Sequence, residues 1–176
     1  IAAVVQTFAG QPLADSHFSV TLASTDIVGT QQTELGIGNQ LVLDDERLLA
    51  NVQQVQAANQ LVQSDTLLGR HFSIEMETGT GKTYVYLRTI FELNKEYGFT
   101  KFIIVVPSVP IREGVLASID LMKEHFTAIY NQPFSRVVYD SKALGQVRQF
   151  ATSNAIQIMI MNIQSFQKDV KDDSEI

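Results

Sequence analysis

From residue 72 onward, short apolar runs alternate with longer segments of helical periodicity, and this alternation limits the possible folds more than any other feature. The runs at 102–106 and 158–161 are apolar without interruption, as strands are when both faces of their sheet are covered. Alternating strands and helices join into parallel sheets through right-handed crossovers. The sequence therefore predicts an α/β fold with a mostly parallel sheet and helices on both faces. The expected strands are 72–76, 102–106, 136–139 and 156–161, and the expected helices are 82–97, 111–128 and 142–151.

The first 65 residues follow a different pattern. The expected elements are a helix over 1–9 that ends before Gly10 and Pro12, a strand over 18–22, a long loop over 23–40 and a helix capped by Asp44 or Asp45. The inward face of that last helix is Leu48, Val52, Val55 and, as a further candidate, Leu61. We therefore divide the chain into a helical and loop extension, 1–65, and an α/β lobe, 66–176.

Composition excludes several classes of protein. The 176 residues, 45% of them apolar, fit one domain with a packed core. With no cysteine, a disulfide scaffold, a thiolate zinc site and a cysteine nucleophile are excluded. The three histidines, His17, His71 and His125, are far apart, and we expect none of them to ligate a metal. No apolar run approaches the ~18–20 residues of a membrane span, and no signal segment opens the sequence, so we expect a cytoplasmic protein with no membrane contact.

The charge is unevenly distributed along the chain. The net charge of −6 lies within residues 1–65, where seven acidic residues accompany Arg47 as the single basic residue. Residues 66–176 are neutral, and within them 66–168 carry a net +3. A basic stretch within an acidic chain permits an anionic ligand but does not identify one.

A glycine-rich segment, Met-Glu-Thr-Gly-Thr-Gly-Lys-Thr at 76–83, lies between the first expected strand and helix of the lobe. Gly79 and Gly81 can adopt backbone conformations closed to other residues, so that successive N–H groups point into one concavity. The following helix begins there, and its N-terminus also favours an anion. Lys82 supplies a charge for the β- and γ-phosphates, and the Thr83 hydroxyl can ligate Mg²⁺.

The segment therefore predicts a nucleotide triphosphate site, although Met76 stands where the full phosphate-loop pattern has glycine. The residues expected to bind ATP are Thr78, Gly79, Thr80, Gly81, Lys82 and Thr83. Among them Lys82 and Thr83 are the expected catalytic residues, and Thr83 is the expected metal ligand.

A hydrolytic phosphate-loop protein also needs a carboxylate at the end of a neighbouring strand, to hold Mg²⁺ and orient water. Two segments imitate such an acid. Residues 44–46 follow an apolar run but stand where a helix begins, so a helix cap is the favoured interpretation. Asp140 follows an expected strand, but Ser141 and a helical pattern come next, and capping is again favoured. We expect the strand that carries the acid to lie after residue 176.

Residues 76–93 (METGTGKTYVYLRTIFEL) and 97–108 (YGFTKFIIVVPS) resemble the motor region of the restriction (Res) subunit of type III restriction–modification enzymes, members of helicase superfamily 2. The resemblance extends back to Val4–Pro12 and forward to residues 158–166. Loops of this superfamily often lack the first glycine, which accounts for Met76. Glu77 favours the type III family over the type I motor subunit, which usually has alanine there.

The resemblance implies an ATP-dependent DNA translocase and endonuclease that cleaves foreign double-stranded DNA together with a modification (methyltransferase) subunit. It implies a RecA-like lobe, incomplete at both ends: the adenine-reading glutamine would precede residue 1, and the acidic motif, second lobe and nuclease would follow residue 176. The isolated chain is therefore expected to be inactive. By the same resemblance Ser108, Arg112 and Asn162 would contact the DNA backbone.

Each DNA candidate also has a structural interpretation. Ser108 can cap the helix ahead of Pro110, and Arg112 can be a surface ion-pair partner. Two other functions stay open for the chain as a whole. One is a different superfamily 2 motor, of a type I restriction or repair system. The other is a small phosphate-loop kinase with Asp140 as its base, although no arginine-rich lid segment is present.

Overall fold

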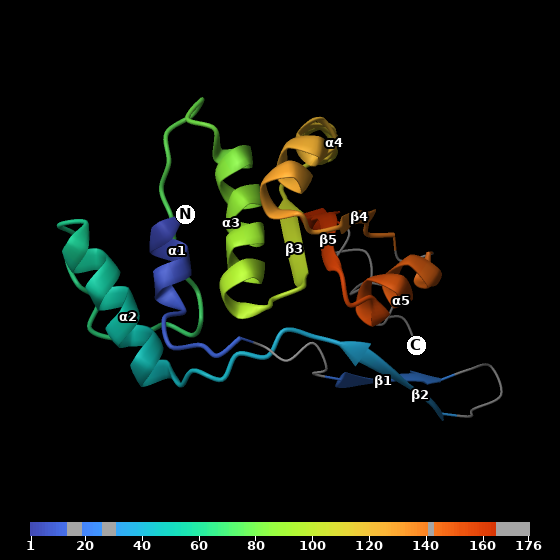
Figure 1. The fold of residues 1–176 in the computed structure, drawn as a ribbon, viewed down its shortest axis with the longest axis horizontal. Helices are drawn as coiled ribbons and strands as arrows, with labels where there is room; N and C mark the ends of the chain where they lie inside the picture. The colour runs from blue at the N-terminus through green and yellow to red at the C-terminus, as the bar shows by residue number, and fades with distance from the viewer. Residues whose placement is uncertain (14–18, 26–30, 141–142, 165–176) are drawn as a thin grey trace. The chain divides into compact units, whose positions relative to one another are not determined.

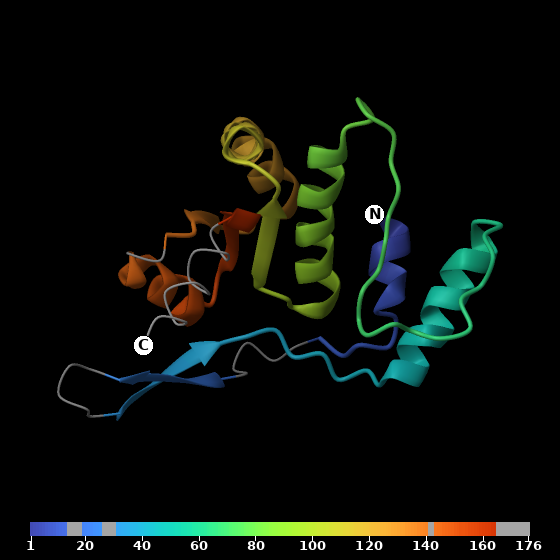
Figure 2. The same cartoon turned by 180° about the vertical axis from the view of Figure 1, so that it is seen from behind.

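The computed structural model describes residues 1–13, 19–25, 31–140 and 143–164. The chain forms two compact units, each built from two stretches of sequence. The first unit comprises Ile1–Leu13 and Gln40–Gly98, and the second comprises Ala14–Asn39 and Phe99–Ile176. Figures 1 and 2 show the elements of each from opposite sides.

The first unit contains three helices: α1 (Ala2–Thr7), α2 (Asp45–Ala58) and α3 (Lys82–Tyr97). Helix α1 packs against both α2 and α3 and lies between them in both views (Figures 1 and 2). Two buried side chains bind the C-terminal part of α1. The Asn51 amide of α2 donates hydrogen bonds to the Thr7 and Ala9 carbonyls at 3.0 and 2.9 Å. The Tyr97 hydroxyl of α3 donates to the Val5 carbonyl at 2.8 Å. These bonds connect α1 to both neighbouring helices.

Helix α3 has the bounds that the sequence predicts. It follows Gly81 and ends at Gly98, whose left-handed backbone (φ +71°) lets its N–H reach the Asn94 carbonyl at 2.8 Å. A glycine in this position is the commonest way for a helix to stop.

Helix α2 begins as predicted, with Asp44 at the N-cap. The Asp44 carboxylate accepts a hydrogen bond from the Arg47 N–H at 2.7 Å, so the capping interpretation of this acid is confirmed. Leu48 is fully buried, whereas Val52 and Val55 are half-buried. Leu61, the further candidate for the inward face, does not belong to it, because the helix ends at Ala58 and Leu61 is 61% exposed.

The second unit contains a parallel sheet of β3 (Lys101–Val106), β4 (Phe134–Val138) and β5 (Ile156–Asn162), in the order β3-β5-β4. These strands confirm three of the four expected in the lobe. The central strand β5 is buried along its whole length, which is why its apolar run shows no alternation. In the β3–β5 ladder Val106 stands opposite Asn162, so the two strands end at the same edge.

Two helices connect these strands, α4 (Val109–Tyr130) and α5 (Leu144–Thr152). Arg136 of β4 forms a hydrogen-bonded ion pair with Asp120 of α4. Lys101 of β3 donates to the Ser153 carbonyl at the end of α5 and lies over the Phe150 ring. In the sheet, Lys101 and Arg136 stand in adjacent rows of side chains. Because adjacent rows of side chains point to opposite faces, the two helices cover opposite faces of the sheet, as the sequence predicts.

An antiparallel hairpin in the second unit corrects the loop expected over 23–40. Strand β1 (Ser19–Thr25), expected at 18–22, pairs with β2 (Gln31–Ile37), from Ser19 opposite Ile37 to Thr25 opposite Gln31. The sequence of β2, Gln-Gln-Thr-Glu-Leu-Gly-Ile, has too few apolar residues to show a period of two, and the strand exists through its backbone pairing with β1.

The strand expected at 72–76 is not formed. The segment, which belongs to the first unit, has the apolar pattern of a strand, but no described residue pairs with it in a ladder. The side chains of Phe72 and Ile74 are 39% and 61% exposed. A strand requires a neighbour for its backbone N–H and C=O groups, and hydrophobicity alone does not supply one.

Asp44→Ala should lower the free energy of unfolding by about 1 kcal/mol, the usual cost of losing an N-cap side chain. Asp65→Ala is the matched control, since it removes one exposed acidic residue outside any helix. Urea denaturation of both variants measures the difference. Equal stability of the two variants would show that the Asp44 carboxylate does not stabilise α2.

Candidate functional site

The glycine-rich loop lies directly before α3 in the first unit, and its two glycines adopt the conformations for which the sequence predicts them. Gly79 has φ +82° and Gly81 has φ +80°, and Gly81 is the N-cap residue of α3. A Cβ atom added at either position would meet no atom within 4 Å, so the requirement for glycine comes from the backbone angle and not from crowding. The loop therefore presents the N-terminus of α3 through an open turn.

The loop is closed by two short-range hydrogen bonds. The Thr80 hydroxyl donates to the Glu77 carbonyl at 2.7 Å, and the Lys82 ammonium donates to the Met76 carbonyl at 3.0 Å. Lys82 is exposed, and no ion pair formed by the described residues includes it. A lysine charge bound only by a neutral carbonyl, beside free helix N–H groups, suits an anionic ligand. The arrangement fits the phosphates of a nucleotide.

Thr83 lies on the first turn of α3, half-buried, where its hydroxyl oxygen suits Mg²⁺ as a hard ligand. One turn further along the helix, burial raises the pKa of the Tyr86 phenol, and the side chain of Thr83 acts in the opposite direction. The buried Tyr86 oxygen has no hydrogen-bond partner of normal geometry among the described residues. Sequence reasoning did not single out Tyr86, and its spacing of three from Thr83 is the signal that could have done so.

Three further candidates belong to the second unit. Ser108 and Asn162 lie at the edge where β3 and β5 end, since Ser108 follows β3 by two residues and Asn162 stands opposite Val106. Ligands of open α/β sheets bind at this edge. Asn162 is 6% exposed, and its amide donates to the Gln164 side-chain oxygen at 3.3 Å.

Ser108 occupies the N-cap position of α4, but its side chain makes no capping hydrogen bond. Its backbone carbonyl accepts the Arg112 N–H at 3.0 Å, which places Arg112 one turn into α4. The Arg112 guanidinium pairs with the neighbouring Glu113 carboxylate at 2.9 Å. The ion-pair interpretation of Arg112 is thus what the structure shows, although a pair with an exposed partner is weak enough to exchange for a phosphate.

Asp140 follows β4, whose ladder is extended by the Tyr139 N–H donating to the Ile160 carbonyl at 2.9 Å. The helix α5 begins at Leu144 with Ala143 at the N-cap, so Asp140 is not the N-cap residue that the sequence favours. Asp140 lies two residues beyond the last residue of β4, whereas Asn162 is itself the last residue of β5.

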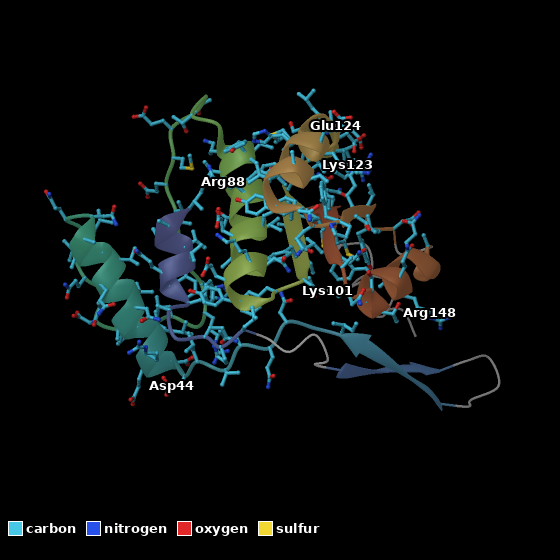
Figure 3. The ribbon with its side chains drawn as sticks, viewed as in Figure 1. Asp44, Arg88, Lys101, Lys123, Glu124 and Arg148 are labelled. Carbon is cyan, nitrogen blue, oxygen red and sulfur yellow. The ribbon has the colours of Figure 1, made fainter. Side chains whose placement is uncertain are left out.

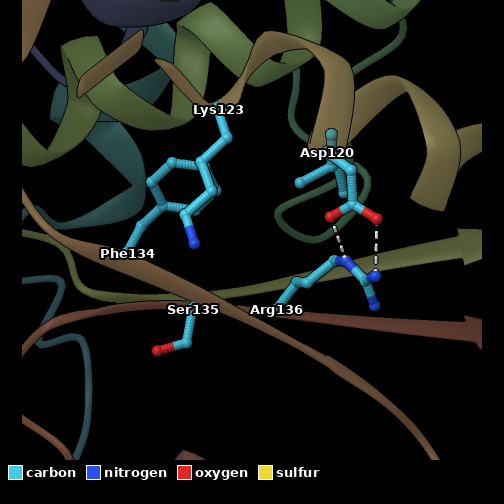
Figure 4. Close-up of a pocket in the computed structure, with 6 residues that line it drawn as sticks. Asp120, Lys123, Phe134, Ser135 and Arg136 are labelled. Carbon is cyan, nitrogen blue, oxygen red and sulfur yellow. Dashed lines mark hydrogen bonds and ion pairs between the residues drawn. The ribbon is translucent and has the colours of Figure 1, made fainter. Parts of the chain in front are cut away.

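A pocket that the sequence did not predict lies between α4 and β4 (Figure 4). Its lining residues are Ile119, Asp120, Lys123, Phe134, Ser135 and Arg136. The Arg136 guanidinium binds Asp120 through both carboxylate oxygens at 2.7 and 2.6 Å, and this pairing lowers the pKa of the Asp120 carboxyl. Lys123 is the third charged residue of the lining, and its charge also lowers the pKa of Asp120 (Figures 3 and 4).

The described residues contain no group of three or more histidine, cysteine, aspartate or glutamate side chains placed to hold a metal ion. None of the helices in the described part of the chain combines the length and the apolar character needed to cross a membrane.

The fold and the loop together define an α/β protein with a phosphate-loop motif at the start of a helix. Residues 48–176 match the family model described as "Type III restriction enzyme, res subunit". The chain belongs to this family, and the resemblance and the RecA-like fold class predicted from the sequence are confirmed.

Three curated relatives are named as Res subunits of type III restriction-modification enzymes. The chain is 38% identical over 108 residues to the Res subunit of the type III restriction-modification enzyme EcoP15I of Escherichia coli, and 35% identical over 111 residues to that of EcoPI of Escherichia phage P1. These matches cover 58% and 60% of the chain and 11% of each relative. It is 47% identical over 62 residues to the StyLTI Res subunit of Salmonella typhimurium strain LT2, which covers 34% of the chain and 6% of that relative. The chain thus spans about a tenth of the length of the first two.

Proposed function

We propose that this chain is the ATP-binding part of an ATP-dependent DNA translocase and endonuclease of a type III restriction system, which cleaves foreign DNA. The observation that carries the proposal is the loop before α3, where Gly79 and Gly81 hold left-handed conformations and Lys82 lies at the helix start. Family membership supports the type III system over a type I or repair motor and over a small kinase.

ATP with Mg²⁺ is the proposed ligand of the residues from Thr78 to Thr83. The backbone N–H groups around Gly79 and Gly81 would bind phosphate oxygens, Lys82 would neutralise the β- and γ-phosphates, and Thr83 would ligate the metal. Bound Mg²⁺ would supply charge neutralisation for phosphoryl transfer. Lys82 would exchange its hydrogen bond with the Met76 carbonyl for one with phosphate, and this exchange strengthens the bond because the new acceptor is charged.

Double-stranded DNA and a modification (methyltransferase) subunit are the proposed partners. Ser108, Arg112 and Asn162 would line a track for one strand and contact its phosphates without reading bases. Asn162 lies at the end of β5, Ser108 lies just beyond the end of β3, and Arg112 lies one turn into α4; these positions support the role. A cytoplasmic location belongs to the same proposal, because both ATP and the DNA substrate are found there.

The nucleotide site is tested by Lys82→Ala. Loss of a charge-assisted hydrogen bond, at about 1.5–3 kcal/mol, should weaken binding of a labelled ATP analogue by at least about tenfold. The thermal midpoint should not change, since Lys82 is exposed. Lys95→Ala is the control, because it removes the same charge from the other end of α3, where Lys95 pairs with Glu96 at 3.8 Å. Equal affinities for wild type and Lys82→Ala would refute the assignment of the loop.

The DNA track is tested by Arg112→Ala. Each phosphate contact releases counterions, so the variant should flatten the salt dependence of DNA binding by about one unit of slope, equally for unrelated duplexes. Lys123→Ala, which removes one charge from a later turn of α4, should leave the slope unchanged. A change in which duplex sequence is preferred would contradict a backbone track. An unchanged slope would mean that Arg112 serves only its pair with Glu113.

A further inference from the structure

Tyr86 carries a polar group for which the described structure provides no partner. Its hydroxyl oxygen is buried and makes no hydrogen bond of normal geometry. Nearly all buried polar groups in proteins have partners, and one without a partner costs about 1–3 kcal/mol. A phenylalanine would fill the same volume without this cost. The hydroxyl therefore needs an explanation that packing does not supply.

The position of Tyr86 on α3 indicates which group it serves. Residues three apart lie on the same face of a helix, and long helical side chains lean toward the N-terminus, so the Tyr86 phenol extends back over the turn that holds Thr83. The influence of the Thr83 side chain on the Tyr86 phenol agrees with this direction. The two hydroxyl groups are therefore neighbours: that of Thr83 lies in the first turn of α3, next to the loop, and that of Tyr86 comes from the following turn.

We propose that Tyr86 is a positioning residue for Thr83. In the nucleotide-bound state the Thr83 hydroxyl donates its proton to the Tyr86 oxygen, which fixes the Thr83 rotamer and leaves the Thr83 oxygen lone pairs free to ligate Mg²⁺. This inference rests on the proposed function, because it requires Thr83 to be the metal ligand. Outer groups that orient a ligand in this way typically contribute 10–100-fold to metal affinity.

The test measures how much Mg²⁺ is needed for half-maximal binding of a fluorescent ATP analogue to the intact protein. Tyr86→Phe should raise that concentration about tenfold while leaving binding without Mg²⁺ unchanged. Its thermal midpoint should be no lower than that of the wild type, because the substitution removes an unpaired hydroxyl. Tyr84→Phe is the matched control: it makes the same change on the same helix, but residues one or two apart do not face each other, so it should not alter the Mg²⁺ requirement.

A double-mutant cycle with Thr83→Ala separates the inference from the function on which it rests. If Tyr86 acts through Thr83, Tyr86→Phe should have no further effect on the Mg²⁺ requirement once Thr83 is alanine. An effect of equal size in both backgrounds, or a wild-type Mg²⁺ requirement in Tyr86→Phe while Thr83→Ala loses Mg²⁺ dependence, would overturn the positioning role alone. A normal Mg²⁺ requirement in Thr83→Ala would overturn the proposed metal ligand and this inference together.

Discussion

The left-handed backbone of Gly81, at the residue before α3 begins, is the constraint on which the candidate nucleotide site depends. It turns the chain into the helix within one residue, so that Lys82 and Thr83 occupy the first turn, beside N–H groups that no helical carbonyl can satisfy. Any residue with a Cβ would be strained at φ +80°, although space is open around it. The loop geometry and the helix dipole therefore act on the same place, and both favour an anion.

In the second unit the corresponding constraint is the parallel ladder. Because β5 pairs with β3 on one side and β4 on the other, all three strands end at one edge, and the residues that follow them are brought together although they are far apart in sequence. Ser108, Asp140 and Asn162 reach that edge in this way. The Lys101 to Ser153 contact and the Arg136 to Asp120 pair hold α5 and α4 on opposite faces of the same sheet.

Local chemistry explains what the sequence could predict. Gly98 and Asp44 give α3 and α2 their bounds, and the unbroken apolar run of β5 reveals a central strand. Elements that depend on a distant partner are harder to predict. Residues 72–76 have the sequence pattern of a strand but pair with no other described residue in a ladder. Strand β2 has the sequence pattern of a loop but pairs with β1. At the candidate site, the glycine conformations follow from residue type alone. The buried Tyr86 hydroxyl and the Arg112 pair with Glu113 depend on side-chain packing, which spacing does not fix.

The proposed site requires the loop before α3 to bind the phosphates of ATP through its backbone. Amide hydrogen exchange, resolved by residue and measured with and without a non-hydrolysable Mg²⁺–ATP analogue, detects this binding at the N–H groups themselves. We expect the N–H groups from Gly79 to Thr83 to exchange more slowly when the analogue is bound, because phosphate oxygens accept their hydrogen bonds. Binding of the analogue with unchanged exchange at these residues, and protection elsewhere in the chain, would contradict it.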